Sequence, residues 1–177
     1  VILSGGDPLM LDDRLLADLI AKLDAIPHLK RLRVHTRLPI VLPSRVTPGL
    51  CEALAASRLG SVLVVHANHP RELSTEVGAA LDRLRQSSII LLNQSVLLAG
   101  VNDRVAALAE LSEGLFAAGV LPYYLHMLDR VAGAAHFSVR TDIAVELISE
   151  LRRRLPGYLV PRLVREDAGR PQKTPVA

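Results

Sequence analysis

Short apolar segments alternate with amphipathic segments along the whole sequence, and this alternation constrains the fold more than any other feature. The apolar segments have the length of β-strands and lie at residues 1–4, 32–36, 61–67, 88–95, 122–128 and 157–164. The segments between them have helical periodicity, at about residues 12–25, 47–57, 74–87, 103–118 and 140–154. Because strands that alternate with helices form βαβ units, the sequence predicts an α/β fold with a parallel sheet.

The predicted helices have clearly marked starts. Asp, Asn, Ser and Thr are favoured at helix N-caps because their side chains accept a hydrogen bond from the first turn. The residues of these types that precede the helical segments are Asp12, Thr47, Ser74, Asn102 or Asp103, and Thr141. We therefore expect each helix to begin directly after one of them.

Polar residues gather at the carboxyl ends of the predicted strands. They lie at residues 4–7 (SGGD), 35–37 (HTR), 66–69 (HANH), 93–95 (NQS) and 126–129 (HMLD). A barrel enzyme assembles its site from the carboxyl ends of many strands, whereas an open sheet concentrates its ligand at one switch point. The pattern therefore favours a barrel and a site for a polar, charged small molecule.

Charge and composition argue against several classes of protein. The net charge is only +3 and aromatic residues make up 3% of the chain, so a nucleic-acid surface is not indicated. No segment approaches the roughly 20 apolar residues of a membrane-spanning helix, so no membrane partner is expected. Cys51 is the single cysteine, which rules out an internal disulfide and favours a cytoplasmic location.

Two polar segments near the predicted strand ends could carry chemistry. Gly5 and Gly6 tolerate positive φ and lack a Cβ, so the backbone there can approach a ligand, with the Asp7 carboxylate beside it. An ordinary Gly-Gly turn is the alternative. His66 and His69 have a spacing seen in metal sites, but no convincing third ligand is near, so a hydrogen-bonding role is favoured.

Amide and carboxylate groups mark the later strand ends. Asn93 and Gln94 offer donors and acceptors that suit a polar ligand, or else they cap the next helix. Tyr124 and His126 lie on the following strand, and Asp129 comes just beyond it. Asp129 either pairs with the ammonium group of a substrate or caps a turn.

The C-terminal segment contains one lysine between two prolines. Pro171 and Pro175 flank Lys173, and this composition predicts that the segment neither continues a helix nor lies inside a sheet. Lys173 is then either a solvated residue or an amine presented to a ligand. A lysine that forms a Schiff base must be neutral to attack an aldehyde, so the second role needs a suitable pocket.

Several segments, taken in their order along the chain, resemble the lysine 2,3-aminomutase family of radical S-adenosylmethionine enzymes, which also use pyridoxal 5′-phosphate. The segments are LSGGDPL, TRLPIVLPSRVTP, HANHPRE, NQSVLLAGVND, PYYLHMLD, GAAHF and GYLVPRLV…KTPV. The resemblance implies a radical S-adenosylmethionine-type partial (β/α)6 barrel with parallel strands. Residues 1–156 would form the barrel core, and residues 157–177 the C-terminal strand and the lysine segment that binds pyridoxal phosphate.

The resemblance also implies an activity and its partners. The enzyme would be an isomerase that moves the α-amino group of L-lysine to give β-lysine. PYYLHMLDRVAGAAHF is most similar to the branch that makes (R)-β-lysine for modification of elongation factor P, because the free-lysine branch has Tyr where this chain has His126. A homo-oligomer is left open. The alternatives are a free-lysine enzyme that gives (S)-β-lysine, a Schiff-base aldolase-type barrel without radical chemistry, and a non-catalytic remnant.

Individual roles follow from the same resemblance. Lys173 would form the Schiff base with pyridoxal phosphate, and Asp129 and Glu166 would bind the ammonium group of the substrate. The segment from Gly5 to Asp7 would lie near the methionine amino group of S-adenosylmethionine. The full set of residues expected to bind cofactors is Gly5, Gly6, Asp7, His66, Asn93, Gln94, His126 and Lys173.

One part of the family pattern does not occur in this chain. Family members bind a [4Fe–4S] cluster through a CxxxCxxC motif, and such a cluster needs thiolates, but Cys51 stands outside any such motif. The sequence begins with Val1, inside a strand-like segment. We therefore expect the N-terminal, cluster-bearing part to lie upstream, and this fragment alone to be inactive.

Overall fold

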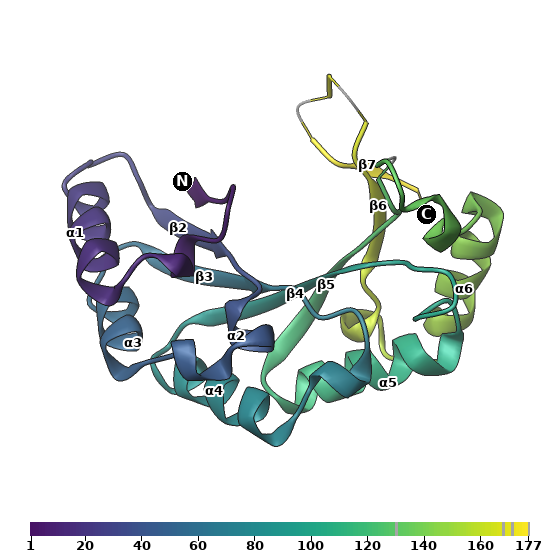
Figure 1. The fold of residues 1–177 in the computed structure, drawn as a ribbon, viewed down its shortest axis with the longest axis horizontal. Coiled ribbons are helices and arrows are strands. Elements are labelled where there is room, and N and C mark those ends of the chain that lie inside the picture. Colours follow the sequence, from purple (N-terminus) through teal and green to yellow (C-terminus); the bar gives the residue numbers. More distant parts are fainter. Residues whose placement is uncertain (130, 168, 171, 177) are drawn as a thin grey trace. The chain divides into compact units, whose positions relative to one another are not determined.

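The computed structural model describes residues 1–129, 131–167, 169–170 and 172–176, and it has the predicted alternation of strands and helices (Figure 1). The strands are β1 (Ile2–Leu3), β2 (Arg31–His35), β3 (Gly60–Val65), β4 (Ile90–Val96), β5 (Val120–His126), β6 (Arg162–Arg165) and β7 (Thr174–Pro175). The α-helices are α1 (Asp13–Asp24), α2 (Leu38–Val41), α3 (Pro48–Ala55), α4 (Thr75–Gln86), α5 (Val105–Ala117) and α6 (Thr141–Arg154).

The strands follow one another in the sheet in chain order, from β1 to β7. β1 pairs with β2, β2 with β3, and β5 with β6, all in parallel. β7 is antiparallel to β6. The predicted parallel α/β fold is therefore confirmed, with one short antiparallel strand added at its end.

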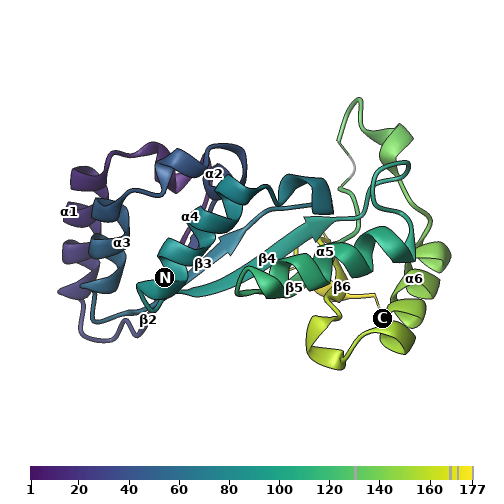
Figure 2. The ribbon, with the colours of Figure 1, turned by 90° about the horizontal axis from the view of Figure 1, so that it is seen from below.

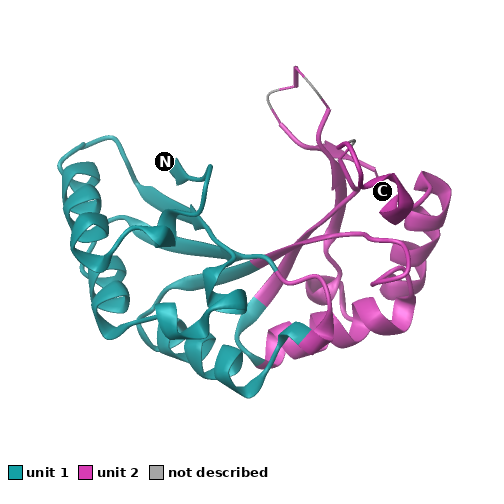
Figure 3. Ribbon diagram, in the orientation of Figure 1, with its two compact units in different colours: residues 1–66, 72–92, 118–120 teal, residues 67–71, 93–117, 121–177 magenta. Residues whose placement is uncertain are grey.

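The chain divides into two compact units (Figure 3). Unit 1 contains residues 1–66, 72–92 and 118–120, and unit 2 contains residues 67–71, 93–117 and 121–177. The boundary expected from the sequence, between residues 156 and 157, lies within unit 2.

Each unit buries the helix-facing side chains of its strands. In unit 1, Leu32 and Val34 of β2 are buried, and α1 packs beside α3 (Figure 2). In unit 2, Leu125 of β5 and Leu163 of β6 join one apolar cluster with Ile148 of α6. Alternation along each strand leaves the other side chains available for a site.

Three of the predicted helix caps are confirmed. Asp12 Oδ1 accepts a hydrogen bond from the backbone N–H of Leu15 at 2.8 Å. Thr47 Oγ1 accepts one from Leu50 N at 3.1 Å, and Ser74 Oγ accepts one from Val77 N at 3.3 Å. These bonds satisfy N–H groups that the first helical turn cannot satisfy itself.

The other two predicted caps are wrong. Asn102 closes a loop before α5: its Oδ1 accepts from Leu98 N at 2.7 Å, and its Nδ2 donates to Val96 O at 2.9 Å. Because α5 begins at Val105, neither Asn102 nor Asp103 directly precedes it, contrary to the prediction. Thr141 is the first residue of α6. Residues that suit a cap also suit loop closure, so their type alone does not fix the helix start.

The expectation that the proline-flanked tail lies outside any sheet is wrong for its second half. Thr174 and Pro175 form β7, in which Pro175 pairs with Val164. Proline is tolerated in a sheet at an edge, where its missing N–H breaks no ladder bond. Pro171 lies outside the described residues. The segment predicted as a strand at 157–164 begins instead with a 3-10 turn at Gly157–Leu159.

The structure also shows no helix, within the ranges that it describes, of the length and apolarity needed to cross a membrane.

A polar cluster fixes the segment that follows β1. Arg45 donates hydrogen bonds from Nε to Leu9 O at 2.6 Å, from Nη2 to Leu11 O at 2.7 Å and from Nη1 to Asp13 at 2.6 Å. Thr47 also donates to Asp13. Burial tends to raise the pKa of Asp13, but the hydrogen bonds from Thr47 and Arg45 outweigh it and lower this pKa. Asp13 therefore adds stability at neutral pH that is lost as the pH falls through its folded-state pKa.

Replacement of Gly49 by Ala is expected to lower the free energy of unfolding by about 1–3 kcal/mol. The added Cβ would lie 2.9 Å from Oδ2 of Asp13, an oxygen that already accepts the hydrogen bond from Thr47. Urea or thermal unfolding measures the change.

Gly78→Ala in α4 is the matched control, because a Cβ at Gly78 meets no atom within 4 Å among the described residues. It should raise the free energy of unfolding by about 0.5–1 kcal/mol, as expected for Ala in place of Gly inside a helix. If Gly49→Ala stabilises the protein as well, Asp13 is not held against this glycine.

Candidate functional site

The Gly5–Gly6 turn follows β1 in unit 1 and requires glycine. The φ angles are +85° at Gly5 and +58° at Gly6, in the left-handed region that disfavours side chains. A Cβ built on either residue meets no described atom within 4 Å. The backbone of the turn therefore borders open space and can be approached by a ligand, as the sequence predicts.

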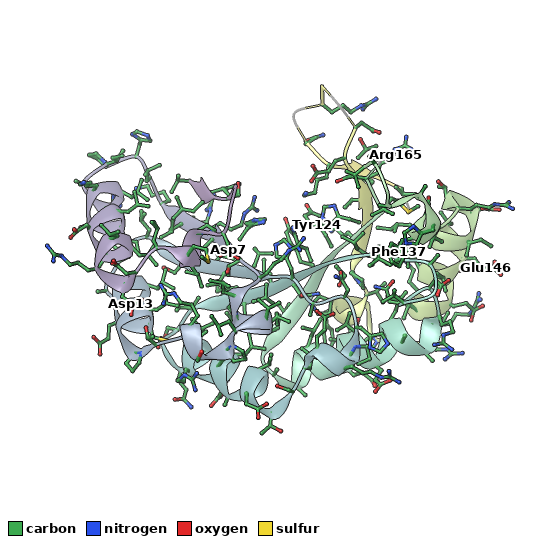
Figure 4. All side chains as sticks on the ribbon, viewed as in Figure 1. Asp7, Asp13, Tyr124, Phe137, Glu146 and Arg165 are labelled. Atoms are coloured by element: carbon green, nitrogen blue, oxygen red, sulfur yellow. The ribbon has the colours of Figure 1, made fainter. Side chains whose placement is uncertain are left out.

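Asp7, which is labelled in Figure 4, uses both carboxylate oxygens to attach this turn to the end of β2. Its Oδ1 accepts hydrogen bonds from Thr36 Oγ1 at 2.7 Å and from Leu9 N at 3.0 Å. Its Oδ2 accepts one from Arg37 N at 2.7 Å. Asp7 thus fixes the position of the glycine turn, a role that the strand-end pattern does not distinguish from ligand binding.

Basic side chains line one face of β2 in unit 1. Arg33 and His35 alternate with the buried Leu32 and Val34, and the His35 ring lies 6.0 Å from that of His66, edge to face. Arg33 Nε is buried and has no hydrogen-bond partner within the described part of the chain. Arg33 is not among the site residues predicted from the sequence, although a charged residue at an alternating position inside an apolar strand is a detectable signal.

Asn93 and Gln94 of β4 point to opposite faces of the strand, so the structure separates these two predicted site residues. Asn93 is 1% exposed; its Oδ1 accepts from Ala67 N at 2.8 Å, and its Nδ2 donates to Ala67 O at 3.1 Å and to Ser95 Oγ at 2.8 Å. Gln94 Oε1 is buried without a hydrogen-bond partner among the described residues. The Gln94 oxygen is therefore the acceptor of this pair that is left for a ligand.

Lys173 lies against Tyr124 and Glu166 in unit 2. Its Nζ is 5.6 Å from the centre of the Tyr124 ring, and it forms an ion pair with Glu166. The Lys173 side chain is 26% exposed. The hydrogen bond from Lys173 lowers the pKa of Glu166, against a weaker opposing effect of burial. The structure thus brings together two of the predicted site residues with an aromatic face.

Tyr124 and His126 follow each other on the same face of β5. Their rings meet edge to face with centres 5.7 Å apart, and the hydroxyl groups of Tyr123 and Tyr124 are 3.0 Å apart. His126 is buried, with 8% exposure. These contacts hold the Tyr124 ring in the orientation in which it meets Lys173.

Asp129 borders a cavity of about 430 Å³ in unit 2. The other lining residues are Leu128, Val131, Ala134, Ala135 and Ser138. An apolar wall with a carboxylate at its edge suits an aliphatic chain that ends in an ammonium group. Asp129 is exposed, so its carboxylate is accessible to such a ligand.

The described residues contain no group of three or more His, Cys, Asp or Glu side chains that could hold a metal ion. His69 Nδ1 accepts a hydrogen bond from Arg71 N at 3.2 Å, which agrees with the hydrogen-bonding role favoured for this histidine. Cys51 is buried in α3, and burial raises the pKa of its thiol. A buried thiol with a raised pKa does not fit a cluster ligand, which must be a thiolate.

Replacement of Asp7 by Asn is expected to lower the free energy of unfolding by about 1–3 kcal/mol, because an amide N–H₂ would face groups that donate to the carboxylate. Hydrogen exchange at the backbone N–H groups of Leu9 and Arg37 should accelerate as well. Asp12→Asn is the control, since Asn caps a helix as well as Asp does. Unchanged stability and exchange in Asp7→Asn would show that this carboxylate does not hold the turn.

No protein-family model matches this chain, but curated proteins match nearly all of it. It is 53% identical over 176 residues to an L-lysine 2,3-aminomutase of Escherichia coli, which covers 99% of this chain and 52% of that protein. It is 52% identical over 174 residues to one of Haemophilus influenzae, covering 98% of this chain and 52% of that protein. One from Clostridium subterminale is 42% identical over 177 residues, covering 99% and 42%. The chain spans about half the length of the first two of these relatives.

Two solved structures share the fold. A domain of a pyruvate-formate lyase-activating enzyme from Bacteroides vulgatus superposes with a TM-score of 0.63 at 12% identity, covering 94% of this chain and 98% of that one. A radical SAM methyltransferase from Sphaerobacter thermophilus gives 0.56 at 19% identity, covering 77% and 41%. These likenesses confirm the α/β fold class with parallel strands predicted from the sequence.

The alignments with the first two relatives cover 98–99% of the chain, so they span its sequence from the glycine turn to the C-terminal lysine segment. The resemblance to the lysine 2,3-aminomutase family, which the motifs predict, is therefore confirmed over nearly the whole of this chain.

Proposed function

We propose that the protein containing this chain is a radical S-adenosylmethionine, pyridoxal phosphate-dependent L-lysine 2,3-aminomutase. The observation that carries the proposal is the placement of Lys173 against Tyr124 and Glu166, in a chain 53% identical to a protein named L-lysine 2,3-aminomutase. The reaction is an isomerisation, in which the α-amino group of L-lysine moves to the β-carbon.

The surroundings of Lys173 fit pyridoxal phosphate. Lys173 supplies the amine to which the cofactor is attached, and the Tyr124 ring offers a flat face for the pyridine ring. When bound, the cofactor would supply a conjugated ring system able to delocalise an unpaired electron while the nitrogen migrates. The contacts of Tyr124 with Tyr123 and His126 keep this face in place. His126 is buried on the same strand, and its ring packs edge to face with the Tyr124 ring.

The glycine turn fits the amino-acid part of S-adenosylmethionine. Gly5 and Gly6 present backbone groups to open space, and Asp7 fixes the turn by its bonds to Thr36 and Arg37. His66 of unit 1 is proposed to contribute to binding of S-adenosylmethionine. The buried Gln94 oxygen of unit 2 is proposed to accept a hydrogen bond from a bound cofactor. Because the Asn93 amide is bonded to Ala67 and Ser95, we assign Asn93 a positioning role. Cys51, a buried thiol with a raised pKa, does not fit as a ligand of the [4Fe–4S] cluster.

The substrate is proposed to be L-lysine, bound through its ammonium group. Asp129, at the edge of the apolar cavity, provides one carboxylate, and Glu166 provides a second. Carboxylates that bind an ammonium group exclude substrates without this charge, which gives the site its specificity. His126 within PYYLHML supports the branch that gives (R)-β-lysine for elongation factor P over the free-lysine branch.

Conversion of L-lysine to β-lysine is the direct test of this function. The protein containing this chain is incubated without oxygen with L-lysine, pyridoxal phosphate, S-adenosylmethionine and a reductant, and the products are separated by chiral chromatography. We expect (R)-β-lysine, formed only when S-adenosylmethionine is present. The (S) product would support the free-lysine branch. Lysine cleavage without S-adenosylmethionine would support an aldolase-type enzyme and contradict the proposal.

Replacement of Asp129 by Ala is expected to lower kcat/KM for L-lysine by about tenfold to a hundredfold, because a hydrogen bond to a charged group is lost. S-adenosylmethionine and pyridoxal phosphate should still bind. Asp142→Ala, which removes an exposed carboxylate at the start of α6, should leave kcat/KM unchanged. Equal kcat/KM for Asp129→Ala and the unaltered protein would refute the ammonium-binding role.

A further inference from the structure

The hairpin of β6 and β7 places Glu166 and Lys173 opposite each other. Val164 pairs with Pro175, and Arg165 pairs with Thr174. The same antiparallel register, continued by one residue on each strand, puts Glu166 across from Lys173, where cross-strand side chains interact. Their ion pair follows directly from the register of the two strands.

The hairpin has a second carboxylate, which braces the loop independently of Glu166. Asp167 accepts a hydrogen bond from Thr174 Oγ1 at 2.7 Å and lies 3.1 Å from Arg165 Nε. The Glu166 side chain is 55% exposed and contacts the tip of Lys173. Glu166 can therefore change its partner while Asp167 keeps the loop closed.

The Glu166 carboxylate cannot pair with the Lys173 ammonium group and with a substrate ammonium group at the same time. The substrate role requires a carboxylate open to an incoming ammonium group, yet the carboxylate holds the ammonium group of Lys173 in this structure. Attachment of pyridoxal phosphate requires the neutral amine: its lone pair forms a C=N bond with the aldehyde carbon, and the carbonyl oxygen leaves as one molecule of water. The proton of the ammonium group must leave first, to Glu166 or to solvent. Once the nitrogen is part of the C=N bond, Lys173 no longer brings the cationic NH₃⁺ group to Glu166.

We propose that Glu166 serves two ammonium groups in turn: that of Lys173 before pyridoxal phosphate is attached, and that of the amine substrate afterwards. The inference rests on the proposed function, because it takes Lys173 as the residue that binds the cofactor. Before attachment, the Glu166 carboxylate is paired with the Lys173 amine. Attachment then frees the carboxylate, so cofactor attachment and binding of the substrate ammonium group favour each other.

The test is the rate of cofactor attachment, which requires neither S-adenosylmethionine nor turnover. The protein is mixed rapidly with pyridoxal phosphate, and the absorbance of the C=N product is followed, with Lys173→Ala as the blank. Glu166→Gln should accelerate attachment about twofold to fivefold, the range expected for loss of a partly exposed ion pair. Asp167→Asn removes the same charge one residue away and should not accelerate it, and Glu166→Asp should keep the slow rate.

The outcomes separate the inference from the function on which it rests. Equal rates in Glu166→Gln and the unaltered protein, or equal acceleration by Asp167→Asn, would overturn the inference and leave the function standing. Absorbance that persists in Lys173→Ala would contradict the cofactor role itself. If Glu166→Gln does not fold, as judged by circular dichroism, Glu166→Ser removes the same charge. Its attachment rate is then compared with those of the unaltered protein and of Asp167→Asn.

Discussion

The antiparallel pairing of β6 with β7 is the constraint that places the lysine of the proposed cofactor site. It turns a short C-terminal segment back along β6, so that Lys173 stands across from Glu166 and near the ring of Tyr124. Asp167 and Thr174 close the loop between the strands. The lysine is thus placed by backbone register together with one side-chain hydrogen bond, and an edge strand accepts the nearby Pro175 without loss of a ladder bond.

In unit 1, side-chain hydrogen bonds likewise hold the glycine turn in place, although they come from different residues. A turn of two glycines has little intrinsic preference for one conformation, since glycine loses more freedom on folding than any other residue. Asp7 compensates by bonding to the backbone and hydroxyl groups at the end of β2. Arg45 holds the following segment through the carbonyl groups of Leu9 and Leu11. In both units, carboxylates near strand ends hold flexible backbone in place beside the residues proposed to meet ligands.

Much of the fold could be predicted because it depends on local patterns. Apolar runs marked the strands, and Asp12, Thr47 and Ser74 marked helix starts. The failures occurred where a residue type serves two purposes. Asn102 closes a loop with an amide that would equally suit a cap, and Pro175 lies in a strand because that strand is an edge, which no local pattern reveals.

The candidate site was predictable in its residue types and less so in their roles. Asp7, Asn93 and Gln94 are all polar residues near the ends of predicted strands, yet hydrogen bonds to residues distant in sequence engage Asp7 and Asn93 and leave the Gln94 oxygen without a partner among the described residues. The pairing of Glu166 with Lys173 depends on the β6–β7 register, which follows from tertiary structure. Resemblance to a family identified both residues, but it did not indicate that they contact each other.

The attachment site of the cofactor tests the central claim most directly. The chain contains three lysines, of which Lys22 and Lys30 are exposed and Lys173 is half-buried. The protein containing this chain is incubated with pyridoxal phosphate and reduced with borohydride, and its peptides are analysed by mass spectrometry. We predict a pyridoxyl group on Lys173 at one equivalent, with Lys22 and Lys30 unmodified. Modification spread over exposed lysines, or absent from Lys173, would contradict it.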